Sequence, residues 1–231
     1  MENVIRRGCK DIWNAWMLEG ASFCKYDIPF CPTTAQNIPA SIVTWRDAEA
    51  AYEKFKRKKF ISNDFVCFYL DDYKFDGKGG IWQNPRHALA VLKRFGGVIT
   101  PDYSTYQDFP EALKIYATYR MRTIGWWLGS NGIAVINNVR WGTTETYSYS
   151  FEGIQKNSFV AIGTVGGSPR RACDKTRFEK GLNQMIKTLS PKAIIVYGSA
   201  NYPCFDAVKA SGIEVYSYKG KTAAFYERRN A

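Results

Sequence analysis

Short apolar runs recur along the chain, and longer segments with helical spacing lie between several of them. The predicted strands are residues 65–70, 97–100, 133–136, 159–163, 193–197 and 213–216. The predicted helices are residues 45–58, 85–95, 110–128, 173–189 and 202–211. Strands that alternate with helices form β-α-β units, and near-continuous apolar strands are typical of burial on both faces. The pattern therefore predicts an α/β fold, a single three-layer domain with a mostly parallel central sheet flanked by helices.

The beginning of the chain does not follow this pattern. It contains a short predicted helix over residues 11–18, followed by an irregular stretch with several prolines. We interpret residues 1–45 as an irregular or helical lead-in packed on the domain, and residues 46–231 as the α/β domain. Residues 143–152 alternate polar and aromatic positions, which predicts an excursion or an edge strand.

Composition adds an argument about partners. The chain of 231 residues carries 32 Lys and Arg against 21 Asp and Glu, a formal charge of +11, and 16% of its residues are aromatic. The commonest partner of so basic a protein is nucleic acid. Basic charge mixed with aromatic rings suits a surface that neutralises phosphates and stacks unpaired bases. The alternative is an aromatic core beneath a solvated basic face.

The lengths of the apolar segments and the number and spacing of the cysteines limit the possible cellular compartment and cofactors. No apolar segment approaches the ~20 residues that span a bilayer, and the start, MENVIRRGCKDIW, lacks the apolar centre of a signal peptide. We therefore expect a cytoplasmic protein that contacts no membrane and keeps its six cysteines reduced. With His87 as its one histidine and no C-x-x-C pair, the chain is predicted to bind no metal and no cofactor. A thiolate site built from Cys9, Cys24 and Cys31 is the alternative.

In parallel sheets, ligands bind outside the carboxyl ends of the strands, so the residues at these ends are the candidates for a site. The strand at 65–70 is followed by Asp71 and Asp72. Two adjacent acids can hold Mg²⁺, or they can form a turn and a helix cap.

Asp102 follows the strand at 97–100 and is the central candidate. Asp108 is the expected cap of the helix that begins near Pro110, so Asp102 is left without a capping role. An acid held among aromatic rings can orient a water or stabilise a cationic, sugar-like transition state. An Asx-turn that closes the loop is the alternative. The aromatic side chains expected to form the walls of a flat base-binding site are Tyr103, Tyr106 and Phe109.

Two consecutive amides, Asn137 and Asn138, follow the strand at 133–136. A side-chain amide offers a donor and an acceptor in one plane, which suits recognition of the edge of a base. Hydrogen bonds to neighbouring loop backbone are the alternative, since buried amides need partners. Arg140 and Trp141, just beyond, suit a phosphate contact and a stacking surface.

A glycine-rich basic segment follows the strand at 159–163 and precedes a predicted helix. Backbone amides at glycines and at a helix N-terminus attract anions, so we predict a clamp for DNA phosphates, with a flexible surface loop as the alternative. Its residues are Gly166, Gly167, Ser168, Arg170 and Arg171. A second basic patch, at the end of the first predicted helix, contains Lys56, Arg57, Lys58 and Lys59.

Five sequence blocks occur in an order that resembles a domain-of-unknown-function family of bacteria, phages and mobile elements. The blocks are FYLDDYKFD, GVITPDYSTYQDFPEALKIYATYRMRTIGWW, SNGIAVINNVRWG, FEGI with NSFVAIGTVG, and LSPKAIIVYG. The resemblance covers roughly residues 31–218 and implies a setting of mobile DNA and phage–host conflict.

A second resemblance, to the uracil-DNA glycosylase superfamily, supplies a chemistry. The matching segments are residues 101–103, a permuted acid–proline–tyrosine motif, 109–116, its helix, 132–138, its asparagine strand, and 178–198, its last helix and strand. The late histidine of that superfamily has no counterpart here. The resemblance implies that Asp102 positions water at the sugar C1′, that Asn137 or Asn138 reads a flipped base, and that Tyr106 or Phe109 stacks on it.

The leading hypothesis from the sequence is a DNA-acting enzyme of the phage–host or mobile-element setting. We expect a base-flipping DNA glycosylase that hydrolyses the N-glycosidic bond of a normal or modified base, with DNA, including phage or modified DNA, as its partner. Its expected catalytic residues are Asp102 and Asn137, and Asn138 is expected to bind the base. Two alternatives are open. One is a nucleic-acid-binding protein without catalysis, such as a replication or anti-host factor. The other is a magnesium-dependent nuclease that uses Asp71, Asp72 and Asp102.

Overall fold

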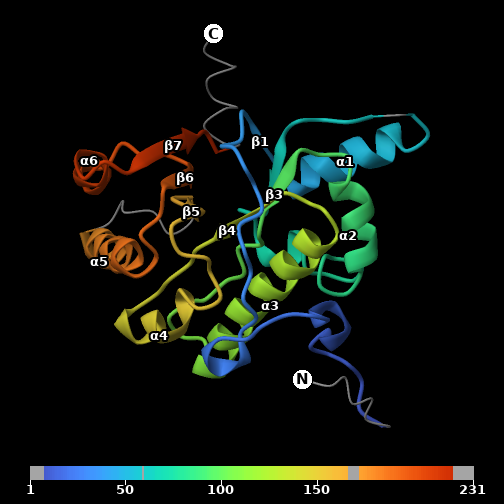
Figure 1. Cartoon of the computed structure of the whole chain (residues 1–231), viewed down its shortest axis with the longest axis horizontal. Coiled ribbons are helices and arrows are strands. Elements are labelled where there is room, and N and C mark those ends of the chain that lie inside the picture. Colours follow the sequence, from blue (N-terminus) through green and yellow to red (C-terminus); the bar gives the residue numbers. More distant parts are fainter. Residues whose placement is uncertain (1–7, 59, 166–171, 221–231) are drawn as a thin grey trace.

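A computed structural model describes residues 8–58, 60–165 and 172–220. Within this part of the chain, the sheet has seven strands, all parallel, and their spatial order is their order in the sequence (Figure 1). The strands are β1 (Ile42–Thr44), β2 (Phe65–Cys67), β3 (Gly97–Ile99), β4 (Val135–Asn138), β5 (Phe159–Gly163), β6 (Ala193–Tyr197) and β7 (Glu214–Tyr218).

Helices connect successive strands. The α-helices of the described residues are α1 (Trp45–Phe55), α2 (Pro85–Leu92), α3 (Glu111–Ser130), α4 (Tyr147–Ser150), α5 (Ala172–Leu189) and α6 (Pro203–Ala210). Short 3₁₀ helices are η1 (Ala15–Leu18), η2 (Lys25–Asp27), η3 (Asp72–Lys74) and η4 (Thr144–Thr146). The predicted α/β class, a single domain with a parallel sheet, is confirmed. In the described residues the helices cover one face of the sheet and a loop fills the other, so the domain differs from the predicted three layers. None of the described helices is long and apolar enough to cross a membrane.

Two stretches differ from the pattern-based elements. β1 lies inside the expected lead-in, because its three residues are too short a run to stand out from the irregular sequence before them. The stretch 143–152 is an excursion that contains η4 and α4, not an edge strand. The Thr146 hydroxyl bonds the carbonyl of Thr143 at 2.8 Å and accepts from the Gly142 amide at 3.0 Å, and such local bonds favour turns over strands.

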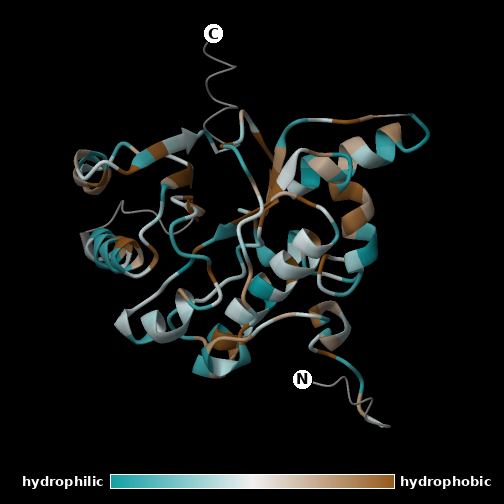
Figure 2. Cartoon of the chain, in the orientation of Figure 1, coloured by the Kyte–Doolittle hydropathy of each residue, from teal (hydrophilic) through white to brown (hydrophobic). Residues whose placement is uncertain are grey.

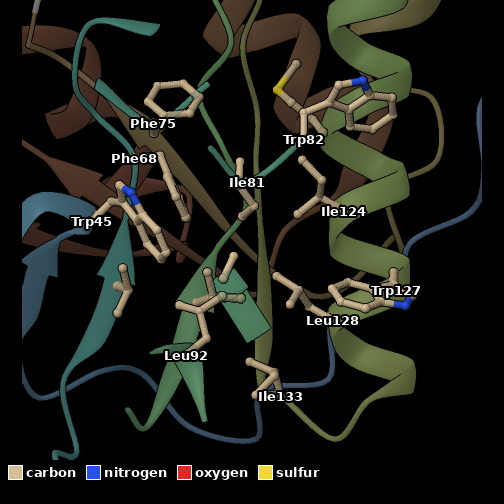
Figure 3. Packing of buried hydrophobic residues seen from close by; sticks show 14 of the residues in the cluster. Trp45, Phe68, Phe75, Ile81, Trp82, Leu92, Ile124, Trp127, Leu128 and Ile133 are labelled. Carbon is tan, nitrogen blue, oxygen red and sulfur yellow. The ribbon is translucent and has the colours of Figure 1, made fainter. Parts of the chain in front are cut away.

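The helices pack on one face of the sheet. Successive strand residues point to opposite faces, and Val66, Val98 and Val135 on the outer face pack against α1, α2 and α3. Figure 3 shows large side chains of this cluster: Ile124 and Leu128 point from α3 toward the strands, and Trp45 lies beside Phe68, on which it stacks. A second outer cluster joins β5 and β6 to α5 and α6. The strands follow one another in sequence order without a reversal. Because β-α-β crossovers are right-handed, this order places all the connecting helices on one side of the sheet. The sheet curls so that the helices lie outside.

The inner face of the curled sheet is filled by strand side chains and by the loop that leads into β1. Tyr69, Ile99 and Tyr197 belong to this inner cluster together with Ala35 of the loop. The Tyr218 hydroxyl of β7 donates to the carbonyl of Pro39, so the loop also joins the last strand. Figure 2 shows hydrophobic residues concentrated on the strands near the centre of the molecule.

The segment before this loop lies on α3. The Tyr116 hydroxyl donates to the Ile12 carbonyl at 3.1 Å, and the Tyr119 hydroxyl donates to the Trp13 carbonyl at 2.9 Å. Trp16 of η1 meets Trp127 edge to face with ring centroids 5.5 Å apart. Successive turns of α3 therefore hold residues 12–16, and Figure 1 shows the segment that contains η1 beside α3.

Candidate functional site

A pocket of about 290 Å³ opens at the edge of the sheet where the carboxyl ends of the strands meet. It lies between the loop that precedes α3, the segment that follows β4, and the first turns of α5. This is the edge at which parallel α/β sheets bind ligands. Charged and aromatic residues of its wall include Asp102, Tyr106, Lys114, Arg140, Trp141 and Arg177.

Asp102 is held from two sides. Its Oδ1 accepts a hydrogen bond from Nδ2 of Asn138 at 2.9 Å, and its Oδ2 accepts one from Nη1 of Arg140 at 2.6 Å. The Asp102 side chain is 13% exposed and that of Arg140 is 26% exposed. An ion pair this far from water is less screened than one on the surface, so it fixes the direction of the Arg140 guanidinium.

Asn138 is buried beside Asp102, and each of its polar groups has a partner. Its Oδ1 accepts from the Tyr69 hydroxyl at 2.9 Å, and its backbone amide donates to Oγ1 of Thr100 at 2.8 Å. Its backbone carbonyl accepts from Arg122 at 3.0 Å. Asn138 therefore positions the Asp102 carboxylate by a hydrogen bond, and its own amide has no free edge for a ligand.

Asn137 points to the opposite face of β4, because neighbouring strand residues alternate. Its Nδ2 donates to the carbonyl of Cys31 at 2.9 Å, and the side chain is fully buried. Its Oδ1 has no hydrogen-bond partner among the described residues. The structure thus brings Asn138, and not Asn137, to Asp102.

Of the three aromatic residues expected around Asp102, Tyr106 lies in the pocket wall and is 56% exposed. The ring of Phe109 meets it edge to face with centroids 5.3 Å apart. Tyr103 turns into the outer core instead. Its hydroxyl donates to Asp76 at 3.1 Å, and the Arg120 guanidinium lies 3.7 Å from its ring centroid. Burial raises the pKa of Tyr103 well above its ordinary value, which keeps this hydroxyl protonated.

The loop that carries Asp102 is anchored by one of the two acids that follow β2. Asp72 accepts hydrogen bonds from the backbone amide of Ser104 at 3.0 Å and from its hydroxyl at 2.8 Å. Asp71 is exposed and pairs with Lys74 at 2.6 Å. In the part of the chain that the structure describes, no group of three or more His, Cys, Asp or Glu side chains could hold a metal ion.

The start of α3 differs from the sequence-based expectation. The helix begins at Glu111 with Pro110 as its N-cap residue, and no side chain caps it. Asp108 is exposed in the preceding turn, too far upstream to reach the first free amides, so its predicted capping role is wrong. Asp102 does not cap α3 either, because its side chain bonds Asn138 and Arg140 instead.

Trp141 joins the segment after β4 to α5. Its ring lies 5.4 Å from that of Phe178, and a Cβ atom added at Gly181 would stand 2.0 Å from its Nε1. Only a glycine lets the helix backbone approach the indole this closely. The rest of the half-buried indole lines the pocket.

Lys114 is a site residue that the sequence pattern did not single out. It is 7% exposed, its Nζ donates to the Gln107 carbonyl at 2.9 Å, and it lies 3.8 Å from Oε2 of Glu111. The sequence does contain a signal for Lys114: a cation in the first turn of a helix is unfavourable for the helix dipole, so its presence there indicates another role. Arg177, in the second turn of α5, also lines the pocket.

The predicted basic patch after α1 lies away from the pocket. α1 begins directly after β1 and runs back along the sheet, so its last residues are at the amino-terminal edge of the strands. Figure 1 shows the segment after α1 on the far side of the molecule from α4. Lys56 pairs there with Glu53 at 3.3 Å, and Arg57 and Lys58 are exposed. The predicted contacts Lys59, Gly166, Gly167, Ser168, Arg170 and Arg171 lie outside the described residues.

Fold and pocket together define an α/β protein with a curled parallel sheet and a cation-bearing, aromatic-walled pocket at its carboxyl edge. The chain belongs to the family described as Domain of unknown function (DUF4417), whose model matches residues 21–219. The predicted membership of such a family, with phage members, is confirmed.

Two relatives are phage proteins named Gene 1 protein. That of Mycobacterium phage D29 is 30% identical over 178 residues, which cover 77% of this chain and 62% of the phage protein. That of Mycobacterium phage L5 is 33% identical over 177 residues, or 77% of this chain and 73% of the relative. The chain therefore spans less than two thirds of the D29 protein. No solved structure matches it, and the resemblance to uracil-DNA glycosylases stays a prediction.

Proposed function

We propose that this domain binds nucleic acid and takes one unpaired nucleotide into the pocket at the carboxyl edge of the sheet. The observation that carries the proposal is the placement of Arg140, which Asp102 holds at 2.6 Å in a pocket wall shared with the rings of Tyr106 and Trp141. A cation beside aromatic rings suits a phosphate and an unstacked base.

Cations outnumber acids by one in the pocket lining, where Lys114, Arg140 and Arg177 stand against Asp102 and Asp174. Two of these cations pair within the protein, Arg140 with Asp102 at 2.6 Å and Lys114 with Glu111 at 3.8 Å. The lining is therefore weakly positive, and the fixed guanidinium of Arg140 is the group that would meet an anion. The formal charge of the whole chain, +11, adds a long-range attraction for nucleic acid, and the similarity to two phage proteins is compatible with such a partner.

Hydrolysis of a glycosidic bond is the second candidate, because Asp102 lies in the pocket wall. Each of its oxygens accepts one hydrogen bond, and a carboxylate has about four lone-pair sites, so it retains capacity to hold a water. The magnesium nuclease gains no such support, since Asp71 pairs with Lys74 and Asp72 holds Ser104.

Binding to fluorescent oligonucleotides at several salt concentrations tests the first proposal. Arg140→Ala and Arg177→Ala should each weaken binding about tenfold, by ~1–2 kcal/mol, and lower the slope of log K against log salt by about one. Lys187→Ala is the matched control, because it removes an exposed cation from the last turn of the helix that carries Arg177. Equal effects of all three changes would leave only non-specific attraction and contradict the proposal.

An abasic-site assay with genomic DNA from diverse phages, base-modified genomes included, tests the second candidate. Asp102→Asn keeps the size of the side chain but removes its charge, so it should abolish abasic sites if Asp102 orients water. If the unchanged protein binds DNA but produces no abasic sites, the binding proposal is supported and hydrolysis is contradicted.

A further inference from the structure

We infer that Tyr69 is a positioning residue for the pocket: its hydroxyl, inside the curled sheet, fixes the Asn138 amide so that Nδ2 faces Asp102, which aims Arg140 at the ligand. The inference about the ligand rests on the proposed function. The inference about the amide does not, because it concerns hydrogen bonds within the protein.

The hydrogen bonds form one directed chain from the interior to the pocket. The Tyr69 hydroxyl donates to Oδ1 of Asn138 at 2.9 Å, and Nδ2 of Asn138 donates to Oδ1 of Asp102 at 2.9 Å. The other oxygen of Asp102 accepts from Arg140 at 2.6 Å. Tyr69 and Asn138 are buried, Asp102 is 13% exposed, and Arg140 reaches the pocket.

The direction of the chain follows from the chemistry of an amide. An amide has one donor end and one acceptor end, and a hydroxyl that donates must face the acceptor end. A flipped amide would turn its oxygen toward the carboxylate of Asp102, which places two acceptors against each other. Burial first, and then the charge of Asp102, raise the pKa of Tyr69 well above its ordinary value, so its hydroxyl keeps the proton that it donates.

Tyr69 has little freedom to move. Its ring stacks on that of Tyr197, with centroids 4.9 Å apart and an interplanar angle of 13°. On β5, a Cβ atom added at Gly163 would stand 2.8 Å from the Tyr69 ring. The backbone of Asn138 is fixed as well, by Thr100 and Arg122. Both ends of the Tyr69–Asn138 bond are therefore held by the core.

A double-mutant cycle separates positioning from a general loss of stability. Tyr69→Phe removes the hydroxyl and keeps the ring that stacks on Tyr197. In the unchanged background it should weaken oligonucleotide binding about fivefold, the usual worth of one hydrogen bond. In an Arg140→Ala background it should have no further effect, because Tyr69 acts through Arg140. The same loss in both backgrounds would overturn the inference.

Tyr119→Phe is the control for a lost tyrosine hydroxyl, since that hydroxyl bonds the Trp13 carbonyl at 2.9 Å, away from the pocket. It should leave oligonucleotide affinity unchanged.

A measurement on the unchanged protein covers the case in which Tyr69→Phe does not fold. The side-chain amide protons of Asn138 should exchange with solvent far more slowly in ¹H–¹⁵N spectra than those of the exposed Asn201, because this amide is buried and donates to Asp102. Exchange as fast as that of Asn201 would overturn the inference about the amide. Slow exchange of the Asn138 amide in a protein that binds no oligonucleotide would support the fixed amide and contradict the proposed function.

Discussion

Arg122 shows how much one buried side chain can organise. It is fully buried in α3, and its guanidinium donates to the carbonyls of Glu152 at 3.0 Å, Asn138 at 3.0 Å and Ser150 at 3.2 Å. Burial lowers its pKa to about 10, which still leaves it charged at neutral pH. Arg122 therefore ties β4 and the α4 segment to the central helix.

Replacing Arg122 by Met should destabilise the protein by about 3–5 kcal/mol, because three buried carbonyls lose their donor. Urea unfolding at neutral pH measures the change in free energy. Arg94→Met is the control, since Arg94 is only partly buried and makes one long bond, 3.4 Å, to the carbonyl of Phe60. It should cost less than about 1 kcal/mol. Equal losses in the two variants would contradict the role given to Arg122.

At the residue scale, the sequence indicated the right strand end but could not assign its amides. Asn137 and Asn138 are adjacent residues of the same type, and only the register of β4 decides which of them faces Asp102. Arg122 gave a weaker signal, since it shares a helix face with apolar residues, yet its partners are backbone carbonyls that no sequence pattern reveals.

Packing between α5 and the segment after β4 depends on Gly181. We expect Gly181→Ala to displace Trp141, because the added Cβ would stand 2.0 Å from the indole Nε1. Overpacking of this kind costs about 1–3 kcal/mol. The shift should appear as altered tryptophan fluorescence and a lower midpoint of urea unfolding.

Gly129→Ala is the control for the loss of a helical glycine, because its added Cβ would meet its nearest neighbour, Thr34, at 3.5 Å, an ordinary contact. Since Ala favours helices over Gly by about 1 kcal/mol, this change should not destabilise the protein. An unchanged indole environment in Gly181→Ala would contradict the close approach of α5.

At the scale of elements, long buried segments were predictable and short ones were not. β5 and β6 are continuous apolar runs because both of their faces are covered, and this signal does not depend on tertiary detail. β1 has three residues, and α4 has four with mixed polarity, so neither shows a clear period. The part of the pocket wall that Thr143 and Thr146 form, just before α4, was therefore not predictable from the pattern.

The stability of the whole molecule should fall in alkaline solution. Burial raises the pKa of Cys31 and of Cys67 to about 12, whereas an exposed thiol has a value near 9. In the window from pH 9 to 12 the unfolded chain loses protons that the folded protein keeps, so stability is fully present below pH 9 and falls as pH rises. At about one pH unit above 9, the two thiols together account for a loss of about 2–3 kcal/mol.

Urea unfolding under reducing conditions at pH 8 and pH 10 measures this loss. The double variant Cys31→Ala and Cys67→Ala should be less stable at pH 8, because it leaves small cavities, but should lose less stability between the two pH values. An equal pH dependence in both proteins would assign the alkaline loss to other groups.

At the scale of the whole molecule, the sequence predicted the parallel sheet but not its curl. The apolar runs and their helical connections are local, whereas the strand order depends on which strands pair. The inner face also receives Ala35 from a loop with no periodic pattern. The candidate pocket follows from the curl, because it brings α3, the segment after β4 and α5 to one edge.

The unreversed strand order has a consequence for synthesis on the ribosome. Each strand pairs with the strand made just before it, so the nascent chain can add one unit at a time to a growing sheet. By the time residue 135 has emerged, every residue of the outer cluster under α1–α3 is available. The pocket wall is complete only when α5 follows. A half-made chain should therefore be compact before it can hold a nucleotide.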